Sequence, residues 1–463
     1  MSAALAVRLC VPISDFFSRV TQFYFSCDRL RAALDYRCTL QTSTAPNSRQ
    51  PRARAILRTM RLFSFSSATA NAPGKAAGPS AASPRRVLWL SCTAHALHDG
   101  YTDMIYALLP IWQTDFGLGY GALAMLRAIY AGTMATLQLP AGRLARAFGT
   151  RATLASGTLL AALGYAIAGM SGTLLGLCVA LAISGGGSST QHPLASGAVS
   201  RAYGRNARGP LSIYNFAGDL GKSALPAAIS LLVTVMPWRH ALWAMSAVGV
   251  LVAIVLALFL PSVPRAESSA KETASHGSGN SRAGFSVLFT IGVLDTAVRM
   301  GLLTFLPFLL KTKGISQPML GTALALVFIG GAAGKFVCGW LGARMGVIGT
   351  VFATEGGTAA LILAVIYLPL VPALILLPLV GAMLNGTSSV LYGTVPELTP
   401  VERTERAFAL FYTGVIASGA LAPIAYGFLG DRIGVYGATI ATAATALAIL
   451  PLALVLRPHL RTS

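Results

Sequence analysis

The chain has 463 residues, of which 54% are hydrophobic and only 11% charged, and its formal net charge is +20. A mean hydropathy of +0.66 exceeds what a soluble chain of this length needs to bury its core, so a soluble globular protein is excluded and a polytopic membrane protein is indicated. The six cysteines are scattered along the chain, and we interpret them as packing residues rather than as a metal site or disulfide framework.

Residues 1–84 precede the first apolar span and differ from the rest in composition. They contain eleven basic and three acidic residues, and Ser, Ala, Pro and Arg dominate from Gln41 to Pro84. Such a segment cannot bury enough apolar surface to fold, and it has no long h-region of a secretory signal. We predict that these residues are a disordered basic leader, or that they are not part of the native protein and translation starts at Met60. A targeting or nucleic-acid-binding segment is the less favoured alternative. Removing it should leave membrane insertion and transport intact.

Apolar segments separated by short loops follow the leader. They predict an all-α polytopic membrane protein with an N-terminal six-helix bundle at 85–260, a cytoplasmic linker at 261–284, a C-terminal six-helix bundle at 285–457 and a tail at 458–463. The twelve predicted transmembrane helices are 87–112, 120–140, 152–170, 173–197, 211–236, 240–260, 285–310, 319–341, 347–368, 371–394, 405–429 and 433–456.

The basic residues of the loops predict the orientation of these spans. With the N-terminus inside, sixteen Lys and Arg fall on the cytoplasmic face and four on the opposite face. By the positive-inside rule this asymmetry places both termini in the cytoplasm.

The two predicted bundles also repeat with a constant offset of 197 positions. The matched residues are Pro110 and Pro307, Gly142 and Gly339, Leu144 and Leu341, Gly149 and Gly346, and Pro226 and Pro423. Five matches in one register predict a duplicated six-helix unit, the parallel repeat of transporters with a central site.

The first span carries an unusual number of ionisable residues. His95, Asp99 and Asp103 follow a spacing of four residues, so a helix places them on one stripe. A carboxylate that faces lipid costs several kcal/mol. We therefore expect this stripe to face a protein interior or a water-filled path.

Two segments resemble a known loop motif. The sequences PAGRLARAFGTR at 140–151 and GWLGARMG at 339–346 resemble the loop between the second and third spans of the major facilitator superfamily and its second copy. The acidic position of that motif is Arg146 here and Ala343 in the repeat. The resemblance implies the major facilitator fold, in which the glycines allow tight helix approach and the loop takes part in gating. The gating residues carried over are Gly142, Arg143, Arg146, Gly149, Arg151, Gly339 and Gly346.

Within that superfamily, residues 90–455 resemble the fosmidomycin-resistance-type efflux transporters. The resemblance is carried by His95, Asp99 and Tyr101, by FGLGY at 116–120 and by the His192–Pro193 pair. The resemblance implies that the protein is an antiporter that exports its substrate and is linked to drug resistance. It also implies a central cavity lined by residues of the first, second, fifth and seventh spans. The sequence departs from the family where Leu194 replaces an acid and where Asp219 and Lys222 stand in the fifth span.

The charges inside the spans are the candidate functional residues. His95, Asp99, Asp103 and His192 are the predicted proton-coupling residues, because carboxylates and imidazoles exchange protons. The predicted substrate-binding residues are Tyr101, Arg127, Asp219, Lys222, Asp295, Arg299 and Lys335, since arginine suits bidentate contacts with anions.

Several of these charges have a structural alternative. Asp295 and Arg299 stand four residues apart, and Asp219 and Lys222 stand three apart, so each pair could neutralise itself on one helix face. Arg127 could pair with Asp99 or Asp103. His192 could simply hydrogen-bond a backbone carbonyl at a kink.

These observations predict a secondary active transporter rather than an enzyme. Neither a nucleotide-binding loop nor a catalytic-triad spacing is present in the sequence, and we expect no cofactor and no metal. The predicted activity is proton-coupled efflux of a small organic anion or drug across a bacterial cytoplasmic (inner) membrane. The predicted partners are the small-molecule substrate, protons and the lipid bilayer, with no nucleic acid and a monomeric chain. Proton-solute symport for anion uptake and a non-transporting receptor on the same fold remain the alternatives.

Overall fold

The computed structural model describes residues 83–261, 281–400 and 404–460. The predicted leader, apart from its last two residues, lies outside the described residues. So do most of the predicted linker and the last three residues of the tail.

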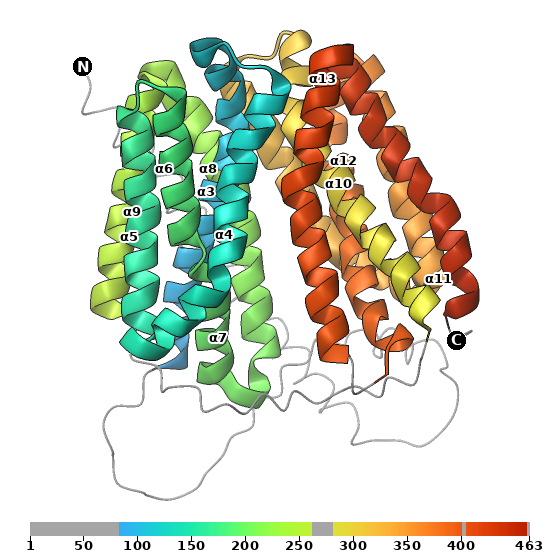
Figure 1. Cartoon of the computed structure of the whole chain (residues 1–463), viewed down its shortest axis with the longest axis horizontal. Helices are drawn as coiled ribbons and strands as arrows, with labels where there is room; N and C mark the ends of the chain where they lie inside the picture. Colours follow the sequence, from blue (N-terminus) through green and yellow to red (C-terminus); the bar gives the residue numbers. More distant parts are fainter. Residues whose placement is uncertain (1–82, 262–280, 401–403, 461–463) are drawn as a thin grey trace, which may run out of the picture. The chain divides into compact units, whose positions relative to one another are not determined.

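The described residues fold into helices joined by short turns (Figure 1). The helices are α3 (Pro84–Phe116), α4 (Tyr120–Phe148), α5 (Thr150–Met170), α6 (Leu174–Ser188), α7 (Gln191–Tyr203), α8 (Arg208–Val235), α9 (Trp238–Phe259), α10 (Arg282–Thr312), α11 (Gln317–Tyr367), α12 (Leu370–Leu398) and α13 (Thr404–Leu456), with single 3₁₀ turns at Gly204–Asn206 and Arg457–His459. In the described part of the chain, eight helical segments are long and apolar enough to cross a membrane. The prediction of an all-α, multi-pass membrane protein is confirmed.

Two of the long helices are broken by glycines with positive φ. The φ angle is 69° at Gly346 in α11 and 75° at Gly434 in α13. Residues with a Cβ rarely adopt this conformation, so glycine is needed where the chain changes direction. These breaks lie within a few residues of the loops predicted from the sequence after 341 and 429.

The predicted fourth span is instead divided into α6 and α7. The Ser189 hydroxyl donates to the Gly186 carbonyl at 2.6 Å, and the Thr190 hydroxyl donates to the Gly187 carbonyl at 3.1 Å. Side-chain bonds of this kind compete with the helical backbone pattern. The regular helix is interrupted at these two residues, whose φ and ψ angles stay helical, and α7 begins at Gln191, just before His192.

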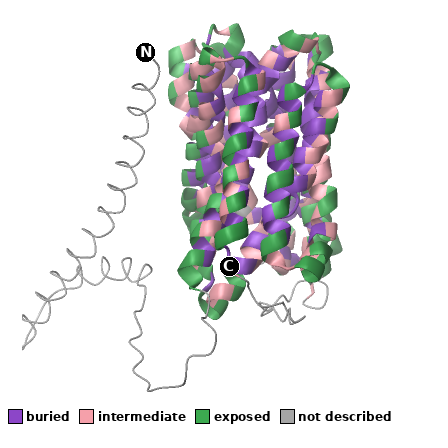
Figure 2. Ribbon diagram, turned by 90° about the vertical axis from the view of Figure 1, so that its left-hand side faces the viewer, coloured by how far each residue is buried: buried purple, intermediate pink, exposed green. Residues whose placement is uncertain are grey.

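Burial separates inward from outward faces of the helices (Figure 2). Tyr101, Tyr106 and Trp112 of α3 are fully buried, whereas Leu139 is 82% exposed and Tyr367 is 76% exposed. Many other large apolar side chains are exposed in the same way. Such a surface is stable in contact with lipid and not with water.

Close helix packing brings the charged stripe of α3 next to α8. A Cβ at Gly221 of α8 would overlap the Ala96 carbonyl of α3, so only glycine permits this approach. Because Gly221 lies between Asp219 and Lys222, the same contact places both charges beside Asp99. The local sequence of α8 thus determines how the site is assembled.

The two sets of helices, α3–α9 and α10–α13, meet near the first residues of α4. The Asp431 carboxylate of α13 accepts hydrogen bonds from the backbone N–H groups of Tyr120 at 2.5 Å and Gly121 at 3.0 Å. Asp431 therefore caps a helix of the other half of the chain, since the first N–H groups of a helix have no partner within it. The Gln317 amide donates to the Ala107 carbonyl at 3.0 Å and adds a second such contact.

Candidate functional site

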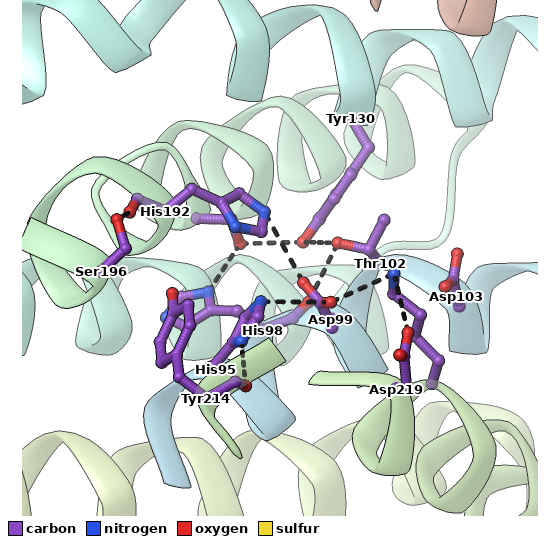
Figure 3. A network of polar contacts seen from close by, with 12 residues as sticks. His95, His98, Asp99, Thr102, Asp103, Tyr130, His192, Ser196, Tyr214 and Asp219 are labelled. Carbon is purple, nitrogen blue, oxygen red and sulfur yellow. Dashed lines mark hydrogen bonds and ion pairs between the residues drawn. The ribbon is translucent and has the colours of Figure 1, made fainter. Parts of the chain in front are cut away.

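Asp99 is the centre of a cluster of ionisable side chains from three helices (Figure 3). Its carboxylate lies 3.3 Å from His95 Nε2 on α3, 3.6 Å from His192 Nε2 on α7 and 3.2 Å from Lys222 Nζ on α8. Asp99 itself is buried. Three basic groups thus surround one buried carboxylate, and His192 faces that carboxylate across the break between α6 and α7.

The hydrogen bonds of His95 determine where protons can be held. Its Nδ1 lies 2.8 Å from the Tyr214 carbonyl oxygen and must carry a proton, because a carbonyl can only accept. The Tyr214 ring stacks on the imidazole at 4.0 Å and fixes its orientation. Nε2 then faces the Asp99 carboxylate, and a hydrogen bond between two acceptors requires one further proton. The geometry thus brings Nε2 of His95 and the Asp99 carboxylate face to face.

His98 has a different role although it lies only one turn away. Its Nε2 contacts the Thr158 hydroxyl at 3.1 Å, and that hydroxyl donates its own proton to the Leu154 carbonyl. Its Nδ1 contacts the Ser188 hydroxyl at 3.1 Å. A neutral ring that donates from Nε2 and accepts at Nδ1 satisfies this arrangement, so His98 joins α3 to α5 and α6 as a structural residue.

Among the described residues, one group has the geometry of a metal site. His95, Asp99 and His192 offer donor atoms that lie within 4.8 Å of one another. The Lys222 ammonium already contacts the same carboxylate, however, and a divalent cation would have to displace it. The donor set therefore fits proton exchange better than metal binding.

Lys222 connects the Asp99 cluster to a second carboxylate. Its Nζ lies 3.9 Å from Asp219, the pair predicted from their spacing on one helix. The closer partner of Asp219 is Lys335 of α11, whose Nζ donates to both carboxylate oxygens at 2.7 Å. Asp219 thus pairs mainly across the two halves of the chain, and Lys222 is shared between two acids.

A cavity of about 240 Å³ lies beside Lys222, between helices of both halves. Four of its lining side chains are charged and the others are apolar, small or amide. The lining residues are Asp103, Asp219, Lys222, Arg299, Met300, Leu303, Phe328, Gly331 and Asn385. A small pocket with a few convergent charges on an apolar wall is the usual form of a solute site.

The two arginines predicted to bind substrate differ in their access to the cavity. Arg299 lines the cavity, whereas Arg127 is absent from the lining among the described residues. Arg127 is buried, with its Nη2 4.0 Å from Asp103 and its guanidinium over the Tyr106 ring at 5.2 Å. Its Nε and Nη1 atoms are buried without a hydrogen-bond partner in the described structure.

Two further predicted substrate-binding residues lie away from the cavity wall. Tyr101 is fully buried, and its hydroxyl donates to the Met245 carbonyl at 2.7 Å. Asp295 is also buried and lies 4.0 Å from Arg299 Nη2, as the spacing of four residues predicted. Neither side chain is among the lining residues.

The glycines predicted to take part in gating differ in their surroundings and backbone angles. A Cβ at Gly142 or Gly339 would meet nothing within 4 Å, so no tight helix approach occurs there. Gly149 and Gly346 instead have φ angles of 87° and 69°, which favour glycine. The side chains of Arg143, Arg146 and Arg151 are exposed beside them.

Sequence reasoning missed several residues of the site. Tyr214 and Asn385 carry no charge, so nothing in the sequence distinguishes them from other span residues. Glu355 stands inside the ninth predicted span, but no basic residue lies three or four positions from it to indicate a pair. Asp431 lies in a predicted loop, where an acidic residue is ordinary.

The fold and the charged cavity define a multi-pass membrane transporter. The model of the Major Facilitator Superfamily matches residues 92–290 and 288–463, and the chain belongs to this superfamily. The Fosmidomycin resistance protein of Escherichia coli is 21% identical over 358 residues, covering 74% of this chain and 86% of that protein. The probable sulfoacetate transporter SauU of Cupriavidus necator is 25% identical over 71% of this chain and 83% of its own length. Human Monocarboxylate transporter 11 is 27% identical over 63% of this chain and 65% of its own length. The similarity to the fosmidomycin-resistance type and the prediction that the chain is not an enzyme are confirmed.

Solved structures share the fold. A bacterial homologue of the human lysosomal transporter Spinster, in an inward-facing and occupied conformation, has a TM-score of 0.68 and 14% identity, over 82% of this chain and 98% of that one. The nucleoside transporter NupG has a TM-score of 0.67 and 12% identity, and the match covers 81% of this chain and 100% of that one.

Proposed function

We propose that this protein is a proton-coupled secondary transporter of a small organic anion. The observation that carries the proposal is the position of Lys222, 3.2 Å from Asp99 and 3.9 Å from Asp219, on the wall of the cavity. One cation thus belongs both to the proton-holding cluster and to the solute cavity. Protonation of Asp99 would neutralise the carboxylate that attracts Lys222. The Lys222 ammonium group would then be available to a solute in the cavity.

The basic groups at the cavity favour an anion as the solute. Lys222 of α8 and Arg299 of α10 line the cavity. Lys335 donates a hydrogen bond to Asp219, which is also a lining residue. Arginine binds carboxylate, sulfonate or phosphonate groups through two parallel hydrogen bonds. Two relatives carry organic anions in their names, sulfoacetate and monocarboxylate, which supports this solute class.

The proposal includes the membrane topology predicted from the sequence. Twelve spans in two six-helix repeats result if α6 and α7 form one span and if α11 and α13 each form two, separated at Gly346 and Gly434. The two adjoining matches of the family model support the duplication. We propose a monomer in a bacterial inner membrane, with both termini in the cytoplasm, as the loop charges indicate.

Efflux in exchange for protons is the first candidate for direction. It is supported by the Fosmidomycin resistance protein among the relatives and by the motif shared with that type. Proton-anion symport is the second candidate, and the shared Lys222 favours it. A proton on Asp99 and an anion on Lys222 would stabilise each other, as co-transport in one direction requires.

A substrate panel tests the proposed function. Purified protein in proteoliposomes should move short sulfonates, phosphonates and carboxylates when a pH gradient is imposed, and growth of a deletion strain on the same panel should identify the preferred compound. Saturable flux above protein-free liposomes for an anion, and not for its neutral amide, is the expected result. Binding without flux would favour the receptor alternative, and the absence of both for every anion would overturn the proposal.

A further inference from the structure

A second pair of buried acids lies behind the cavity in the C-terminal helices. Asp295 of α10 is 3% exposed and Glu355 of α11 is 2% exposed, and the two carboxyl groups lie close enough to interact. Two ionised carboxylates repel each other strongly in a buried site, so we expect one of the two groups to carry a proton. Two carboxylates that share a site hold a single proton for this reason.

A chain of hydroxyl groups extends from Glu355. The Thr387 hydroxyl of α12 lies 2.6 Å from Glu355 Oε1 and 2.7 Å from the Thr354 hydroxyl. Thr354 in turn lies 2.8 Å from the Thr350 carbonyl oxygen. Thr387 has a single proton, which it can donate either to Thr354 or to Glu355. In the first case it accepts a proton from a neutral Glu355, and in the second it donates to an ionised one.

The Thr387 hydroxyl therefore has a hydrogen bond to make with Glu355 in both protonation states of that residue, without movement of either group. This is the property expected of a site that binds and releases a proton, since a carboxyl group with a purely structural role needs only one state satisfied.

The surroundings of the pair connect it to the cavity. Arg299 Nη2 lies 4.0 Å from Asp295, and Arg299 also lines the cavity. Among the described residues, Tyr392 of α12 is the other ionisable group that faces the pair from a neighbouring helix. Helix α13 instead packs the apolar ring of Phe411 against α10. Arg299 is thus the one cation, among the described residues, that faces both the pair and the cavity.

We propose that Asp295 and Glu355 form a second proton-binding site, and that its proton controls whether Arg299 is available to an anion in the cavity. When the proton leaves, two negative charges attract the guanidinium toward Asp295. When the proton returns, Arg299 is free to bind an anion. The part that this site plays in transport rests on the proposed function, but the existence of the bound proton does not.

Infrared difference spectroscopy tests the site without any substrate. Spectra of the reconstituted full chain at low minus high pH should contain the carbonyl stretch of a protonated carboxylic acid. Part of this band should be lost in Glu355→Gln and in Asp295→Asn. Asp115→Asn is the matched control, because Asp115 is a partly exposed acid paired with Arg239 at 3.1 Å, and it should leave the band unchanged.

Two further variants keep the test decisive if a carboxyl variant does not fold. Thr387→Val removes the hydroxyl that accepts the Glu355 O–H and should shift the same band to higher frequency, since the carbonyl of a carboxylic acid with a free O–H vibrates at higher frequency than that of an acid whose O–H donates a hydrogen bond. Arg299→Gln removes the neighbouring cation, so the band should persist to higher pH than in the wild type.

The site and the proposed function fail in different ways. A band that is unchanged in Glu355→Gln and in Asp295→Asn, or unshifted in Thr387→Val, would overturn the proton site. If the band changes as expected in these variants but the wild-type protein shows no proton-driven flux, the proton site would be supported and the proposed function contradicted.

Discussion

Helices α3 and α10 carry acids at nearly corresponding positions, and their surroundings differ. Asp99 of α3 faces His192 of α7 and Lys222 of α8, in addition to a histidine one turn away on its own helix. Asp295 of α10 has a cation one turn away, Arg299, and an acid as its neighbour on α11. The same four-residue spacing therefore produces a cluster rich in bases in one half and a carboxyl pair in the other. What the neighbouring helices present decides the chemistry.

If the base-rich cluster couples protons to transport, its acid should be the most sensitive position. We expect Asp99→Asn to reduce flux driven by a pH gradient to the level of protein-free liposomes, because asparagine neither holds a proton with His95 nor attracts Lys222. Exchange of substrate without a gradient should remain measurable. The control is Asp115→Asn, and undiminished gradient-driven flux in Asp99→Asn would remove Asp99 from the mechanism.

The two arginines differ in their access to the cavity, so their variants should differ as well. Arg299→Gln should weaken binding of an anionic substrate about tenfold or more, since the loss of one charged hydrogen bond exceeds the ~1.4 kcal/mol of a tenfold change. Arg127→Gln should affect affinity less and stability more, because it removes the cation that lies 4.0 Å from the buried Asp103 carboxylate. Isothermal titration and thermal unfolding in detergent measure the two effects. Equal losses for an anion and its neutral amide would show that Arg299 holds helices together.

The contact between the halves offers a smaller effect. Asp431→Ala removes the cap of α4 and should cost about 1 kcal/mol. The loss should appear as a larger distance between spin labels on α4 and α13, since the cap joins these helices. The same labels with Asp115→Ala provide the control, and an unchanged distance distribution would argue against a role of Asp431 in holding α4 and α13 together.

The smallest effect is expected at Lys335. Its side chain is 43% exposed, and exposed ion pairs contribute about 0–1 kcal/mol. Lys335→Gln should lower the midpoint of thermal unfolding only slightly, and a double-mutant cycle with Asp219→Asn should give a coupling energy in this range. A coupling of several kcal/mol would show instead that the pair is a major link between the halves.

The sequence predicted the helices well because hydrophobic length and glycine breaks are local properties. The spans predicted on either side of Gly346, for example, match the break that the positive φ angle creates. The two-residue interruption after Ser188, inside an apolar run, was not predicted. Proline and glycine alone do not signal it.

The pairing of charges was less predictable because it is set by packing between helices. The spacing of Asp219 and Lys222 indicated a local pair, yet Asp219 contacts Lys335 more closely, 113 positions further along the chain than Lys222. Spacing likewise could not distinguish His95 from His98. Their different roles follow from the carbonyl of Tyr214 and the hydroxyls of Ser188 and Thr158, which lie on other helices.

The central claim is that proton and anion movements are coupled through Asp99 and Lys222. A pH-sensitive dye trapped inside proteoliposomes tests it most directly, when the preferred anion is added without an imposed gradient. Our account predicts that wild-type protein changes the internal pH as the anion crosses, and that Asp99→Asn exchanges the anion with no pH change. Saturable transport of the anion by the wild type with no accompanying proton movement would contradict it.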